Sequence, residues 1–133
     1  QGDGEEARKI AAELRKSRAL PALPVSATSV RVPVAIGHCE AIAFGTRTPA
    51  TRHEIAEALR AGAGLKFLDG PEYATALDVA GTDDVVVGRL RPDAAHPGSW
   101  LCWVACDNLR TGAATNAVQI VETVRASTGR VAV

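Results

Sequence analysis

The sequence has no apolar run of about 18 residues, the length that a membrane-spanning helix needs. Aromatic residues make up only 4% of its 133 residues, too few for a surface that stacks on single-stranded nucleic acid. Its 15 Lys and Arg balance 15 Asp and Glu, so neither nucleic acid nor an anionic membrane is an expected partner. The first six residues are polar and acidic, the reverse of a signal peptide. We therefore expect a cytoplasmic protein.

Cysteine is sparse, and Cys39, Cys102 and Cys106 have no regular spacing that would make a disulfide framework. A metal site that combines them with His38 and His53 is conceivable, but no pair has ligand spacing such as C-x-x-C. A dyad of Cys39 and His38 is disfavoured, because adjacent strand residues point to opposite faces. Cys102 and Cys106 share one strand parity and fit a buried face.

The composition is that of a globular domain, with 47% hydrophobic and 23% charged residues, and no linker divides residues 1–133. The cluster Gly62-Ala63-Gly64 ends a helix instead of joining a strand to one, so it fails the dinucleotide-binding pattern. The periodicity predicts helix 5–18, strands 30–36 and 39–44, a helix from Thr51, strands 65–68, 84–90 and 100–106, and helix 112–125. This order favours an α+β domain with a largely antiparallel or mixed sheet.

Several finer expectations accompany these elements. Thr51 and Glu54 have capping-box spacing. Pro33 should place the first strand at an edge or a bulge, residues 69–82 should be irregular, and residues 127–133 form a weak tail. The apolar positions of the last helix should face inward; they are Ala113, Ala117, Ile120, Val121 and Val124.

Arg31 and His38 are candidate functional residues in the segment 31–38, RVPVAIGH. An arginine on the outer side of a strand presents a planar fork that suits a carboxylate, and a histidine is an acid–base group near neutral pH. Without further context, a solvated arginine and a turn histidine are the more ordinary interpretation. Seven residues of straight strand span about 23 Å. The two can therefore serve one site only if the chain turns, which Pro33 and Gly37 would permit.

This segment resembles the Arg-Val-Pro-Val-x-x-Gly-His signature of aspartate-semialdehyde dehydrogenases. In that family the arginine holds the α-carboxylate of the substrate and the histidine is the acid–base catalyst. The resemblance implies these roles for Arg31 and His38. Cys39 departs from the family's usual serine and is not expected to be its nucleophile.

Two further stretches resemble the family in the same order along the chain. The first helix is similar to a Glu-x-x-Lys helix, which implies that Glu6 contacts the substrate amino group and Lys9 the acyl phosphate. A surface ion pair is the ordinary alternative, and Glu5 with Arg8 is the alternative register. Residues 87–91, VGRLR, resemble the family's Val-Gly-Arg-x-Arg strand.

Residues 107–120, DNLRTGAATNAVQI, resemble the family's closing motif, with Thr111 and Thr115 in place of its usual Lys and Leu. In the family this helix packs towards the cofactor half. The resemblance therefore implies cofactor-side roles for Asn116 and Gln119. Helix capping and domain packing are an equally good interpretation of these two amides.

The resemblance implies reductive dephosphorylation of L-aspartyl-4-phosphate to L-aspartate-4-semialdehyde with NADPH, in lysine, threonine and methionine synthesis. It also implies a homodimer and an α+β sheet domain, here incomplete, with its helices on one face. Residues 1–133 would be the C-terminal part of the catalytic and dimerisation domain. The family's nucleophilic cysteine and N-terminal nucleotide-binding domain have no counterpart here, so we expect this chain alone to be inactive. The alternative is a stand-alone, non-catalytic dimerisation or small-molecule-binding domain.

Overall fold

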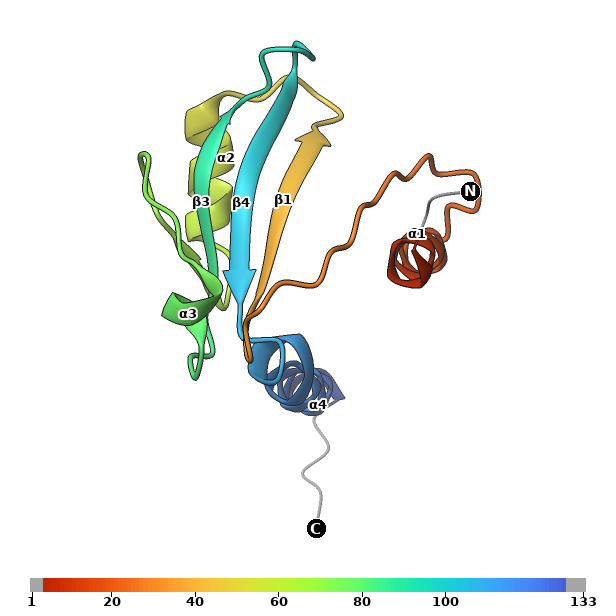
Figure 1. The fold of residues 1–133 in the computed structure, drawn as a ribbon, viewed down its shortest axis with the longest axis vertical. Coiled ribbons are helices and arrows are strands. Elements are labelled where there is room, and N and C mark those ends of the chain that lie inside the picture. Colours follow the sequence, from red (N-terminus) through yellow and green to blue (C-terminus); the bar gives the residue numbers. More distant parts are fainter. Residues whose placement is uncertain (1–3, 129–133) are drawn as a thin grey trace. The chain divides into compact units, whose positions relative to one another are not determined.

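The computed structural model describes residues 4–128, which belong to two compact units, one ending at Pro33 and the other beginning at Val34. No helix in this described part is long and apolar enough to cross a membrane. The elements follow one another as α1 (Glu5–Ser17), β1 (His38–Gly45), α2 (Arg52–Arg60), β2 (Leu65–Phe67), α3 (Ala76–Val79), β3 (Val85–Pro92), β4 (Ser99–Cys106), η1 (Arg110–Ala114) and α4 (Thr115–Thr128) (Figure 1).

The first unit contains α1, and the predicted helix is confirmed. Its first turn is acidic and its last turn basic, which complements the helix dipole at both ends. The Nε–H group of Arg15 donates to the carbonyl of Leu23 at 3.0 Å. This bond folds the proline-containing segment that follows the helix back towards its last turn.

The strand predicted for residues 30–36 is wrong, because this segment is extended but pairs with no strand in the described part of the chain. Its alternating apolar side chains are exposed, Val30 to a fraction of 77%. The chain bends at Pro33 and again at Ala35 and Ile36. A proline has no N–H group to donate to a ladder, so alternation alone could not make this segment a strand.

The second unit is built on a four-stranded sheet in the order β1-β4-β3-β2. The β1–β4 and β4–β3 pairs are antiparallel, and the short β2 pairs with β3 in parallel. The expected mixed, largely antiparallel α+β sheet is therefore confirmed. Figure 1 shows α2 lying along the sheet beside β3.

One face of the sheet packs against α2 and forms the larger core. Thr51 caps α2 through the predicted capping box with Glu54. A register shift between Gly88 and Arg91 interrupts the β3–β4 ladder, and this bulge lets Leu90 join Val87 on the α2 side. The buried members of this core are Ile55, Ala56, Val87, Leu90, Trp100 and Cys102.

The opposite face is covered in part by the segment that contains α3, so the expected placement of the helices on one face is wrong. Val79 packs there with Ala74, Val86 and Ala105, and the indole N–H of Trp103 donates to the carbonyl of Ala74 at 2.8 Å. The segment 69–82 was expected to be irregular. It contains this one short helix, which begins with a capping box between Thr75 and Asp78.

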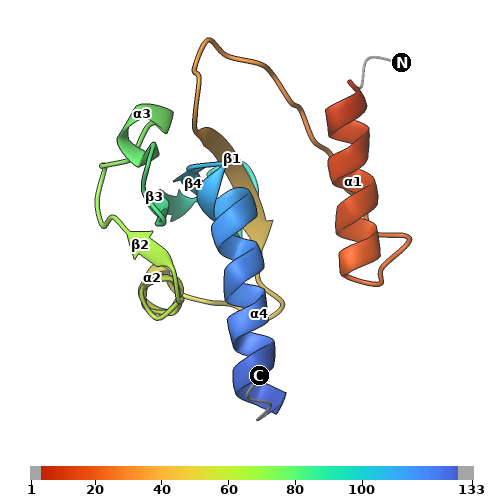
Figure 2. The same ribbon diagram turned by 90° about the horizontal axis from the view of Figure 1, so that it is seen from below.

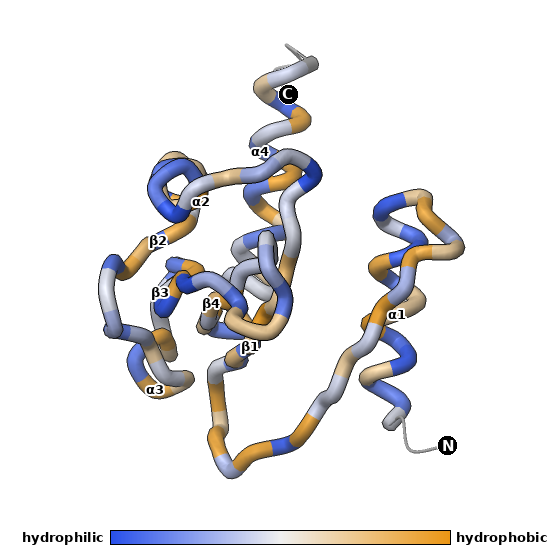
Figure 3. The backbone as a smooth tube through the Cα atoms, turned by 90° about the horizontal axis from the view of Figure 1, so that it is seen from above, coloured by the Kyte–Doolittle hydropathy of each residue, from blue (hydrophilic) through white to orange (hydrophobic). Residues whose placement is uncertain are grey.

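The described part of the chain ends in the π-helical turn η1 and the helix α4, which Figure 2 shows extending from the end of β4. The predicted final helix is confirmed, but its inward apolar face is wrong. Figure 3 shows apolar residues alternating with polar ones around α4, and the predicted inward positions Ala113, Ala117, Ile120, Val121 and Val124 are all exposed. The weak tail was predicted for residues 127–133, of which 129–133 lie outside the described part.

Candidate functional site

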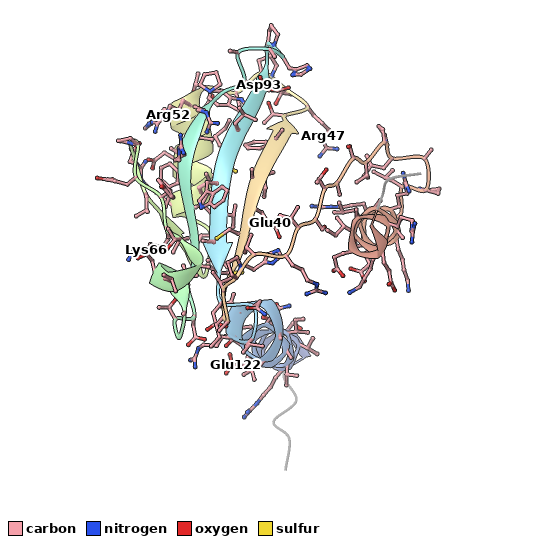
Figure 4. All side chains as sticks on the ribbon, viewed as in Figure 1. Glu40, Arg47, Arg52, Lys66, Asp93 and Glu122 are labelled. Carbon is pink, nitrogen blue, oxygen red and sulfur yellow. The ribbon has the colours of Figure 1, made fainter. Side chains whose placement is uncertain are left out.

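His38 opens β1 and pairs with the carboxylate of Glu40, two residues further along the strand. Its Nε2 atom lies 2.9 Å from Oε1 of Glu40, and both side chains are more than half exposed. Residues i and i+2 of a strand point to the same side, and Figure 4 shows Glu40 on β1. An ionised carboxylate only accepts hydrogen bonds. Nε2 therefore carries the hydrogen in this contact, which leaves the lone pair of the neutral ring on Nδ1.

The backbone before His38 is fixed by residues from far along the chain. Gly37 has a φ of +103°, which places it in the left-handed region that favours glycine. Its N–H group donates to Oδ1 of Asn108 at 2.9 Å. The chain bends before His38 at Pro33, Ala35 and Ile36, and the positive φ of Gly37 and its bond to Asn108 then fix the backbone that enters β1.

The three cysteines lie in surroundings that disfavour a nucleophilic thiolate. Burial raises the pKa of the Cys39, Cys102 and Cys106 thiols, which disfavours the reactive thiolate. Cys39 follows His38 directly in β1, and adjacent strand residues point to opposite faces, which disfavours a dyad between them. Cys106 is the ladder partner of His38 on β4. Within residues 4–128, no group of three or more His, Cys, Asp or Glu side chains could hold a metal ion.

The candidate residues of the first unit are exposed. Nζ of Lys9 lies 3.8 Å from Oε1 of Glu6, so the predicted helical spacing does bring these two side chains together. Arg31 is exposed on the extended segment, not on a strand. Because His38 belongs to the other unit, the structure describes these two groups of candidates separately.

Asn116 and Gln119 lie one helical turn apart on α4. Together with Ile120, Thr123 and Val124 they line a shallow groove of about 280 Å³. Two carboxamides beside aliphatic side chains suit a planar heteroaromatic ring that bears an amide. The cofactor-side roles expected of Asn116 and Gln119 from the sequence stay predictions.

An ionic joint fixes the start of α4 to the loop before β3. The guanidinium of Arg110 donates to both carboxylate oxygens of Asp83, at 2.9 and 2.7 Å, and the hydroxyl of Thr115 donates to Oδ1 at 2.7 Å. The bonds from Arg110 and then Thr115 lower the pKa of Asp83. A second carboxylate, Asp107, is buried and accepts backbone N–H groups, chiefly that of Gly81, which lowers its pKa too.

Two residues that contact His38 or its neighbour Gly37 were not predicted from the sequence. Glu40 could have been found, because it shares strand parity with His38. Asn108 could not, because its contact with Gly37 crosses 71 positions and depends on how β1 and β4 align.

Comparison with known proteins agrees with this architecture. A family model described as the semialdehyde dehydrogenase dimerisation domain matches residues 1–111. The chain belongs to this family.

The particular relatives are aspartate-semialdehyde dehydrogenases. The second such enzyme of Vibrio cholerae is 40% identical over 122 residues, and that of Mycolicibacterium smegmatis is 44% identical over 123 residues. The crystal structure of the Vibrio cholerae enzyme II complexed with ASA has a TM-score of 0.84 and covers 91% of this chain. The chain spans about 36% of the length of that enzyme.

Proposed function

We propose that this chain is the substrate-holding and acid–base portion of an aspartate-semialdehyde dehydrogenase. The complete enzyme would reduce L-aspartyl-4-phosphate to L-aspartate-4-semialdehyde with NADPH, in the synthesis of lysine, threonine and methionine. One observation carries the proposal: 40% identity and a TM-score of 0.84 across 91% of the chain, against an enzyme whose structure is complexed with ASA.

Arg31 would bind the α-carboxylate of the substrate. A guanidinium donates two parallel N–H bonds to a carboxylate, which fixes direction as well as position. Its exposure on an extended segment leaves the side chain accessible to a ligand. Binding at this end of a four-carbon substrate would orient the reacting carbonyl at the other end.

His38 would be the acid–base catalyst. With Nε2–H directed at Glu40, Nδ1 is the atom that accepts a proton from the attacking thiol and later returns one to the substrate oxygen. Glu40 would hold the ring and stabilise the imidazolium while the proton resides on it. The nucleophilic thiol would come from residues outside this chain, because none of the three cysteines here matches the family's nucleophile. Burial also raises the pKa of all three thiols.

Glu6 and Lys9 would contact the charged ends of the substrate. Their side chains emerge from one face of α1 and already approach each other to 3.8 Å. The ammonium of the substrate would pair with Glu6, and its phosphate with Lys9. An exposed ion pair contributes little to stability, so exchanging it for ligand contacts costs little.

Asn116 and Gln119 would hold the nicotinamide end of NADP, with Ile120 and Val124 providing the apolar side of the groove. When bound, the cofactor supplies or accepts a hydride. The rest of the nucleotide would need residues beyond this chain, which contains no glycine-rich dinucleotide loop.

The complete protein would be a cytoplasmic homodimer that pairs through this domain. The family description as a dimerisation domain supports the pairing. Light scattering on the full-length polypeptide should give twice the mass of one chain, and a monomer at high concentration would contradict the assignment.

The test is the reverse reaction of the full-length polypeptide that carries these residues, followed by NADPH absorbance with aspartate semialdehyde and phosphate. His38→Ala should lower kcat by about 100- to 10,000-fold, the usual range for a lost general acid–base. Arg31→Lys keeps the charge but not the planar fork, and should raise KM more than it lowers kcat.

A surface arginine outside the candidate site, Arg47, provides the matched control, and Arg47→Lys should leave both constants unchanged. The 133-residue chain alone should show no turnover. Turnover by homogeneous 133-residue chain, lost in His38→Ala, would overturn the assignment of this chain as one portion of the enzyme.

A further inference from the structure

The backbone at Gly37, directly before His38, is fixed by contacts from two distant segments. A Cβ atom added to Gly37 would lie 2.6 Å from the carbonyl oxygen of Ala76, too close for any side chain. On its other side the Gly37 amide donates to Asn108 at 2.9 Å. A positive φ and a close backbone approach together favour glycine at this position, so a side chain here would displace the backbone that enters β1.

In the turn that contains Asn108, the backbone N–H groups are bonded by the side chain of the preceding residue, Asp107, and not by the carboxamide of Asn108. The Asp107 carboxylate accepts the N–H groups of Gly81 at 2.8 Å, Leu109 at 2.8 Å and Arg110 at 3.2 Å. These bonds hold the turn between β4 and η1 in place. Asn108 sits in that turn and directs its carbonyl oxygen across to the other strand.

Asn108 also lies next to the point where the β1–β4 ladder ends. His38 is paired with Cys106, the last residue of β4, and Asn108 follows two residues later. A side chain just beyond one strand therefore holds the residue just before the histidine on its partner strand. Asn108 is thus bonded to the residue directly before His38, on the backbone that leads to the imidazole.

We propose that Asn108 is a positioning residue for His38, acting through the amide of Gly37. This inference rests on the acid–base role proposed above for His38. Asn108 fixes the backbone from which the imidazole projects, whereas Glu40 fixes the direction of the ring. Proton transfer requires close placement, and a misplacement of about 1 Å costs on the order of 100-fold in rate.

The kinetic arm of the test uses the full-length polypeptide with two substitutions at one position. Asn108→Leu keeps the approximate shape without the acceptor, and should lower kcat by about 10- to 100-fold with KM changed less than about twofold. Asn108→Asp keeps an acceptor oxygen and should restore kcat to within about fivefold of the parent. Thr111→Val is the matched control, because it removes a hydroxyl bonded to the Asp83 carbonyl at 2.7 Å in the adjoining turn, and it should leave kcat unchanged.

The NMR arm measures position without reference to turnover, in the same full-length protein after deuteration. Asn108→Leu should speed hydrogen exchange at the Gly37 amide by about fivefold, the value of one net hydrogen bond. The three-bond couplings that report χ1 of His38 should move towards rotamer averaging in this variant and not in Asn108→Asp or Thr111→Val.

A kcat for Asn108→Leu within twofold of the parent, a change in KM alone, or unchanged Gly37 exchange would each overturn the inference. Absence of turnover in the parent protein would instead refute the proposed function. In that case the exchange rates and couplings still decide whether Asn108 positions His38.

Discussion

Two helices of the second unit have apolar side chains at helical spacing, yet only one of them buries these side chains within the chain. In α2, Ile55 is 8% exposed and packs into the core under the sheet. In α4, Ile120 is 55% exposed. The same residue type on the same kind of element therefore has two different environments.

The different exposure of Ile55 and Ile120 reflects how each helix is attached to the rest of the second unit. α2 is held along its length by hydrophobic contact with the sheet, whereas α4 is held at its beginning by the ionic joint of Asp83, Arg110 and Thr115. Hydrophobic burial stabilises a helix along the whole contact, but a joint at one end fixes only the first turn. Most of the stability contained in this chain should therefore reside in α2 and the sheet.

The largest expected effect comes from one substitution made on both helices. Ile55→Ala leaves a cavity in the core and should lower the free energy of unfolding by about 3 kcal/mol. Ile120→Ala, on the exposed face, should change it by less than about 0.5 kcal/mol. Urea denaturation of both variants measures the difference, and equal losses would show that α4 is packed as firmly as α2.

A smaller effect is expected at the helix starts. Thr51→Ala removes the side-chain oxygen that accepts the N–H of Glu54 at 3.2 Å, and should cost about 1 kcal/mol. Thr115→Ala removes a hydroxyl bonded to exposed Asp83 and should cost less. Thermal melting followed by circular dichroism compares them, and a greater loss in Thr115→Ala would reverse the ranking of the two attachments.

The smallest effect is a local change in acid. The pKa of Asp83 lies below its ordinary value because Arg110 and Thr115 donate to it, and that of Glu54 is lowered chiefly by the backbone N–H of Thr51. A lowered pKa stabilises the folded state fully above the ordinary value, and this stabilisation is lost as the pH falls below about 4. In this pH range each helix loses an ionised carboxylate that accepts hydrogen bonds near its first turn, but α2 keeps its core contacts.

At pH 3 the first turn of α4 should therefore open more readily than α2, and amide hydrogen exchange should be faster there than in α2. Asp83→Asn should produce the same opening at neutral pH, because the amide cannot accept the paired bonds from Arg110 at both oxygens. Simultaneous opening of both helices at pH 3 would show that the ionic joint does not set the local stability of α4.

Local rules predicted much of the fold. The capping box at Thr51 and Glu54, the four strands after residue 37 and the final helix depend on neighbouring residues, and they are confirmed. The same capping-box spacing occurs at Thr75 and Asp78, and this local pattern is sufficient to predict the start of α3. The strand at residues 30–36 and the inward face of α4 were wrong, because alternation and helical spacing state which side is apolar and not what lies against it.

The candidate site divides in the same way. Arg31 and His38 were found from a contiguous motif, and their roles remain predictions. The partner of His38 on its own strand, Glu40, is predictable from strand parity, because residues i and i+2 point to the same side. Asn108 depends on the pairing of His38 with Cys106, and no local pattern in the sequence specifies that alignment.

The position of β1 at the end of the strand order β1-β4-β3-β2 has a practical consequence for handling the chain. The outer backbone groups of a terminal strand form a template on which another chain can add, which is a common route to aggregation. Self-association of the isolated 133 residues is therefore expected to occur edge to edge along β1. A lysine in place of Ala43, an exposed residue of β1, would discourage such stacking and make the chain easier to study in concentrated solution.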